Sequence, residues 1–107
     1  MDLKSKKLMD LLNEGIKHPD VSGFELLELL DIRSQLASRE PLLDENAKDR
    51  LEKLDRQLSQ LAETWAKRIS EVADLSEMRK RSHVLPSHWW WYLDEMSSNR
   101  QKAEVLS

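Results

Sequence analysis

The side chains best suited to metal chemistry lie near the C-terminus, where His83, His88 and Asp94 follow one another closely. Histidine nitrogens and carboxylate oxygens are common zinc ligands, but this spacing matches no metal-binding motif. The chain also has no cysteine, which excludes thiolate ligands, thiol nucleophiles and disulfides. We therefore expect no metal site and no cofactor.

Catalytic arrangements are equally hard to find in this sequence. Acidic side chains alternate with basic ones on faces that we expect to be exposed. The chain contains no glycine-rich phosphate loop, no readable serine, histidine and aspartate arrangement, and none of the Glu-x-x-His pairs of di-iron bundles. We therefore expect that the protein is not an enzyme.

The run Trp89-Trp90-Trp91, followed at once by Tyr92, is the most informative feature of the chain. On a helix that turns about 100° per residue, three consecutive rings spread over roughly 200°. On a strand, Trp90 would point away from its two neighbours. At least one large aromatic ring must therefore face a second surface, which could belong to this chain, to a second copy or to another protein.

A helical arrangement of this run separates the tryptophans by role. Trp89 shares a face with Tyr92 and should pack inside the protein. Trp91 points away, toward the acidic side of the helix, and is suited to contact a partner. The candidate partner-binding residues are Trp90, on the flank of the helix, Trp91, Asp94 and Glu95.

A basic cluster directly before the aromatic run offers a different interpretation. It consists of Arg79, Lys80, Arg81 and His83. Arginines beside stacking aromatics are typical of proteins that bind single-stranded nucleic acid. However, basic residues also favour the C-terminus of a helix, and the net charge of −3 provides no general attraction to phosphates. Nucleic-acid binding is therefore an alternative, which a steep salt dependence of the affinity would favour.

Composition indicates one helical domain over residues 1–107. Charged residues make up 35% and hydrophobic residues 39%, with only 2 glycines and 3 prolines. This balance is too apolar for a disordered chain and too poor in glycine and proline for an all-β fold. No apolar run approaches the roughly 18 residues of a membrane span. A cysteine-free chain is compatible with a reducing compartment, and we expect a cytoplasmic protein.

The apolar spacing predicts two short helices in the first part of the chain. The first covers about 3–16, and Gly15 and the turn at 18–20 should end it. The second covers about 22–38 and begins with a capping box formed by Ser22 and Glu25. The second helix is apolar over more than half of its circumference, which is typical of a central helix that touches two neighbours.

Two further helices are predicted in the rest of the chain. A long one begins at the cap Asp44 and continues to about Arg81. A short one covers 87–100, with Ser87 as its cap, and the tail 101–107 should fray. The predicted fold is thus an all-α helical bundle of three main helices, one of them long and coiled-coil-like, plus a short C-terminal helix.

The long helix carries an apolar seam that resembles a coiled coil. Its main residues are Leu51, Leu54, Leu58, Leu61 and Trp65, at three- and four-residue steps. A helix over 44–81 would span roughly 55 Å, whereas the first two helices span only about 20–25 Å each. The C-terminal segment, a second subunit or a partner must cover the remainder, although a break within 73–82 would ease the mismatch. We expect a homodimer formed through this seam.

Together these features favour a small protein–protein interaction module, such as an adaptor, a regulatory subunit or an assembly factor. An antitoxin of a toxin–antitoxin pair is an alternative by analogy, since such proteins can be small, acidic and helical. The nucleic-acid-binding protein described above is the alternative from another class. The sequence identifies neither the protein partner nor the pathway.

Overall fold

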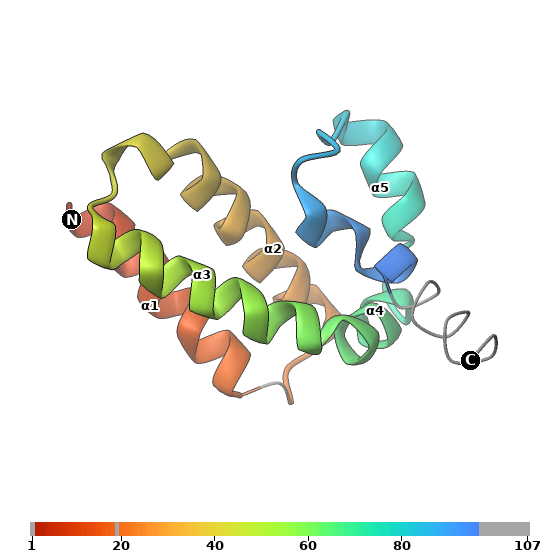
Figure 1. Cartoon of the computed structure of the whole chain (residues 1–107). Helices are drawn as coiled ribbons and strands as arrows, with labels where there is room; N and C mark the ends of the chain where they lie inside the picture. Colours follow the sequence, from red (N-terminus) through yellow and green to blue (C-terminus); the bar gives the residue numbers. More distant parts are fainter. Residues whose placement is uncertain (1, 19, 97–107) are drawn as a thin grey trace, which may run out of the picture.

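The structure, a computed structural model, describes residues 2–18 and 20–96. Its elements in chain order are α1 (Leu3–Lys17), α2 (Gly23–Ser38), the 3₁₀ turn η1 (Glu40–Leu42), α3 (Glu45–Gln60), α4 (Ala62–Ser70), α5 (Leu75–Ser82) and the 3₁₀ turn η2 (Trp89–Tyr92) (Figure 1). No strand occurs among these residues, which confirms the all-α prediction.

Side-chain caps explain where four of the helices begin. The capping residues are Asp2, Ser22, Asp44 and Asp74, and each accepts a hydrogen bond from a backbone N–H in the first turn. The sequence predicts the caps at Ser22 and Asp44, and the structure confirms both. The cap at Asp74 is not predicted, although Glu77 follows three residues later, as in a capping box.

The core lies between α1, α2 and α3, and α4 adds to one end of it. Helix α1 packs against both α2 and α3, while α4 contacts α2 (Figure 1). Helix α2 is therefore central, as its wide apolar arc predicts. Helix α5 and η2 contact each other and reach the rest of the molecule chiefly where η2 meets α2.

The prediction of one helix over 44–81 is wrong, because the chain bends twice and forms α3, α4 and α5. At the first bend, Leu61 has φ −92° and ψ 4°, and its N–H is shared between the carbonyls of Gln57 and Leu58. This bend allows α4 to contact α2, and Trp65 on α4 is fully buried. The second bend occupies residues 71–74 and ends at the Asp74 cap.

The bends change how the predicted seam is covered. Leu51, Leu54, Leu58 and Trp65 are buried within the single chain, and Leu61 is half-buried. The longest dimension of the molecule, 43 Å, is shorter than the roughly 55 Å predicted for the uninterrupted helix. The length mismatch that suggested a homodimer through the seam therefore does not arise.

The first helix also differs from its predicted boundary. Helix α1 continues through Gly15 to Lys17, so this glycine does not end it. A Cβ atom at Gly15 would lie 2.3 Å from Cδ1 of Leu29 on α2. The glycine thus lies where the Leu29 side chain of α2 approaches α1 closely, and it does not mark a helix stop.

The C-terminal helix predicted for 87–100 is replaced by η2, followed by a helical turn through Met96. The Ser87 side chain does not cap it, and His88 precedes η2 without a side-chain capping bond. Residues 97–100 of the predicted helix and the predicted tail 101–107 lie outside the described residues.

Candidate partner-binding site

The 3₁₀ geometry of η2 assigns the three tryptophans differently from the helical-wheel prediction. A 3₁₀ turn rotates about 120° per residue, yet the indoles of Trp90 and Trp91 both reach Ser34. Trp90 is only 2% exposed, whereas Trp89 and Trp91 are half-buried. Trp90 rather than Trp89 is therefore the most deeply buried of the three, and the contact of Trp90 with a partner stays a prediction.

Trp90 is held by stacking contacts on its ring. The guanidinium carbon of Arg33 lies 4.1 Å from the ring centroid, within cation–π distance. The His88 ring stacks on Trp90 with centroids 4.6 Å apart, and Trp89 meets it edge-on at 5.8 Å. The contact with Arg33 anchors the aromatic segment, residues 88–93, to α2, while the other two lie within the segment.

Ser34 on α2 fixes the orientation of two indole rings at once. Its Oγ accepts a hydrogen bond from Nε1 of Trp90 at 2.9 Å and from Nε1 of Trp91 at 2.8 Å. A serine hydroxyl has two acceptor positions and one hydrogen. Both acceptor positions are thus occupied, and within the described part of the chain the hydroxyl hydrogen has no acceptor.

Arg33 connects α2, α3 and the aromatic segment. Its Nε and Nη2 donate to the two carboxylate oxygens of Asp55 at 2.8 and 2.9 Å, and Nη2 lies 3.5 Å from Glu40. Arg33 is only 4% exposed, and its Nη1 is buried without a hydrogen-bond partner among residues 2–18 and 20–96. The only signal for Arg33 in the sequence is that it is a single arginine within the apolar arc of α2.

Arg79, predicted as a nucleic-acid contact, is occupied by contacts within the chain. Its guanidinium donates to both carboxylate oxygens of Asp94, at 2.6 and 3.2 Å, and to the Trp91 carbonyl at 2.8 Å. It also lies 4.7 Å from the Tyr92 ring centroid and 3.5 Å from Glu95. The hydrogen bonds to Asp94 raise the pKa of Arg79, so its charge is fixed and α5 is tied to the aromatic segment.

The other members of the basic cluster are exposed. Lys80, Arg81 and His83 lie at the C-terminal end of α5, where the helix dipole favours positive charge. His83 adopts the left-handed conformation, with φ 49° and ψ 49°, and ends the helix. The structure therefore divides the predicted cluster into one paired arginine and three exposed residues.

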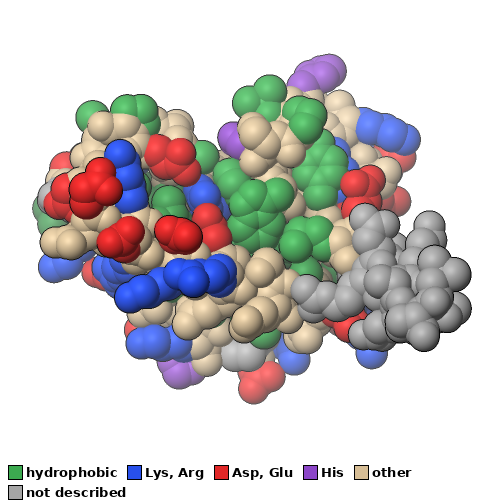
Figure 2. All heavy atoms as spheres, in the orientation of Figure 1, with side chains coloured by type: hydrophobic (Ala, Val, Ile, Leu, Met, Phe, Trp, Pro, Cys, Tyr) green, Lys and Arg blue, Asp and Glu red, His purple; other side chains and the backbone are tan. Residues whose placement is uncertain are grey.

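Trp91 lines an open groove between α2 and α5, of about 330 Å³, which we call the α2–α5 groove. Its walls are formed by Asp31, Ser34, Met78, Ser82, His83, Val84, Leu85, His88 and Trp91. Figure 2 shows a notch between the surfaces over α2 and α5, with hydrophobic side chains along its floor and a histidine at its edge. The predicted partner residues Asp94 and Glu95 do not line this groove, since both lie beside Arg79.

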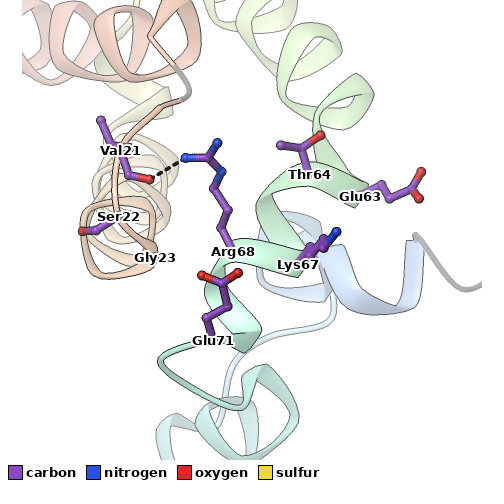
Figure 3. Close-up of a pocket in the computed structure, with 8 residues that line it drawn as sticks. All are labelled: Val21, Ser22, Gly23, Glu63, Thr64, Lys67, Arg68 and Glu71. Atoms are coloured by element: carbon purple, nitrogen blue, oxygen red, sulfur yellow. Dashed lines mark hydrogen bonds between the residues drawn. The ribbon is translucent and has the colours of Figure 1, made fainter.

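A larger hollow, of about 610 Å³, lies between the start of α2 and α4 (Figure 3). Arg68 extends across it and donates to the Val21 carbonyl at 3.1 Å and to Asp20 at 3.2 Å. Ser22 already caps the first turn of α2, and charges of both signs line the walls. With charges of both signs on its walls, this hollow shows no clear ligand preference.

Three further properties concern metal binding, membrane spans and similarity to known proteins. Among the described residues, no group of three or more histidine, aspartate or glutamate side chains could hold a metal ion. None of the described helices is long and apolar enough to cross a membrane. Comparisons of the chain with protein families, curated proteins and solved structures found no match.

Proposed function

We propose that this protein is a small protein–protein interaction module that binds its partner in the α2–α5 groove. One observation carries the proposal: Trp91 lines an open groove, and its indole N–H is already fixed by Ser34. A large aromatic ring held in place before binding loses little conformational freedom in a complex, and such residues often dominate binding energy.

The surroundings of Trp91 support an interaction surface. The groove combines Trp91 with the apolar side chains of Met78, Val84 and Leu85, and polar side chains also line it. An apolar centre with a polar rim is the usual anatomy of a protein interface. Leu85 is also 59% exposed, which is high for a large apolar side chain that has no partner.

An adaptor, a regulatory subunit, an assembly factor and an antitoxin would all use such a surface, and a cytoplasmic location is part of the proposal. Self-association through the predicted seam is not part of it, because α1 and α2 cover that seam. Nucleic-acid binding receives less support, because the side chain of Arg79 is only 11% exposed and pairs with Asp94. No specific observation favours it over a protein partner.

Site-specific photo-crosslinking in the native host tests the proposal. A photoreactive amino acid replaces Leu85, which lines the groove, or Leu42, which lies on η1 and does not line it. The two positions are matched, since Leu85 is 59% and Leu42 63% exposed. We expect one identifiable protein to be crosslinked from position 85 and not from position 42; equal yields would contradict the proposal.

The crosslinked protein, once purified, permits a direct affinity measurement. Trp91→Ala should weaken binding by about 30-fold or more, the loss expected for an aromatic hot spot. Leu42→Ala, at a similarly exposed position outside the groove, should leave the affinity unchanged. An equal loss in both variants would show that the groove is not the contact surface.

A further inference from the structure

We propose that the α2–α5 groove binds one cationic side chain, a lysine or an arginine, presented by the partner protein. This inference rests on the proposed function and adds the chemistry of the group that enters the groove. Three features of the groove carry it: an unpaired carboxylate, a fixed tryptophan ring and a serine hydroxyl that can only donate.

Asp31 provides the charge. Its carboxylate lines the groove and accepts a hydrogen bond from Gln35 Nε2 at 2.9 Å, but it has no ion-pair partner among the described residues. No lysine or arginine of the described chain lines the groove. Apart from its two histidines, the groove is therefore lined by a single charged group, the Asp31 carboxylate, which attracts a cation.

Trp91 provides an aromatic surface for the same cation. Tryptophan is the aromatic side chain with the strongest cation–π attraction. The Nε1 hydrogen bond to Ser34, 2.8 Å long, holds the ring in the groove before any ligand arrives. Met78 and Leu85 supply apolar wall for the aliphatic stem that lysine and arginine carry below their charge.

Ser34 favours a peptide over a free amine. Its Oγ already accepts hydrogen bonds from Trp90 and Trp91, so toward the groove it can only donate its hydrogen. A peptide carbonyl beside the cationic side chain would accept that hydrogen, whereas a simple alkylamine has no acceptor to offer. The size also fits, because about 330 Å³ is at the lower end of ligand-binding pockets and suits a single side chain.

The test uses the full chain labelled with ¹⁵N and follows the indole N–H signals of Trp90 and Trp91. The probes are the N-acetyl, N′-methylamide derivatives of lysine and arginine, with that of norleucine as the neutral control and n-butylamine as the amine without carbonyls. We expect saturable shifts of the Trp91 signal with a cationic probe and binding at least tenfold weaker for norleucine. Equal binding of the norleucine probe, or no shift with either cationic probe, would overturn the inference, and n-butylamine binding as tightly as the lysine probe would overturn its peptide part.

Matched variants separate a specific contact from general attraction. Asp31→Asn should weaken binding of the better cationic probe by about tenfold, while Glu28→Gln should change it less than twofold. Both are exposed acidic residues on α2, but only Asp31 lines the groove. Equal losses in the two variants would mean long-range attraction and would overturn the site.

The two proposals can fail separately. If a partner crosslinks from position 85 but no cationic probe binds, the interaction module stands and the cation site is wrong. If the cationic probes bind but position 85 yields no more crosslinked protein than position 42, the proposed function is wrong, and with it the assignment of the cation to a partner protein.

Discussion

The guanidinium carbon of Arg33 lies 4.1 Å from the centroid of the Trp90 ring, while the same guanidinium binds both carboxylate oxygens of Asp55. One side chain of α2 thereby contacts α3 and the aromatic segment at the same time. Because Ser34, the next residue, binds the indoles of Trp90 and Trp91, the placement of the groove wall depends on this part of α2.

Asp55→Ala should destabilise the fold by about 2–4 kcal/mol, as measured by chemical denaturation. The substitution leaves the Arg33 charge, 4% exposed, without its bidentate partner. Breaking a fully buried pair costs about 3–5 kcal/mol, and the lower range allows for the 22% exposure of the Asp55 side chain. Asp10→Ala, which removes the exposed partner of Arg50, should cost less than about 1 kcal/mol. Similar losses in the two variants would contradict this account of Arg33.

Trp90→Ala should cost about 3–5 kcal/mol, the usual range for deleting a buried aromatic side chain. Trp89→Ala should cost clearly less, because Trp89 is half-buried and the structure gives its indole N–H no hydrogen bond to Ser34. The free energies of unfolding of the two variants can be compared directly. A larger loss at position 89 would restore the helical-wheel assignment.

The aromatic run shows the limit of a prediction based on helical periodicity. The wheel groups Trp89 with Tyr92 on the buried face, whereas the structure buries Trp90, and the step from about 100° to about 120° per residue is too small to account for this exchange alone. Nothing in four consecutive aromatic residues distinguishes the two geometries. The choice follows from tertiary contacts with Arg33 and Ser34, which lie far away in the sequence.

The helix boundaries show what local chemistry can predict. The caps at Ser22 and Asp44 are correct because an N-cap depends on the first turn of its own helix. Asp74 carries a similar cap signal, but the apolar spacing continues on both sides of it, so the spacing predicted one helix across the break. The bend at Leu61 has neither glycine nor proline, and it coincides with the contact between α4 and α2, so only the tertiary structure could reveal it.

Gly23→Ala should destabilise the fold more than Gly15→Ala, although both place a methyl group at a close approach. At Gly23 the new Cβ would lie 2.5 Å from the backbone carbonyl oxygen of Arg68, which can move only if α4 moves. At Gly15 it would meet Leu29 side-chain atoms, which can rotate, and alanine inside a helix gains up to about 1 kcal/mol over glycine. Thermal melts of both variants test the difference, and a higher melting temperature for Gly23→Ala than for Gly15→Ala would contradict it.

Asp2 should make the start of α1 sensitive to acid. Hydrogen bonds from the side chain and backbone of Ser5, together with the Arg39 guanidinium, lower the pKa of Asp2 to about 2. A carboxylate whose pKa is lower in the folded state stabilises the fold above its ordinary value near 4, and this contribution is lost as the pH falls through about 2. Asp2→Asn is the matched control, because asparagine also caps helices but has no charge to lose. The melting temperature of the native chain should exceed that of Asp2→Asn at about pH 5, and the difference should shrink steadily toward about pH 2. A difference that stays constant over this range would show that the Asp2 charge does not contribute to the stability of α1.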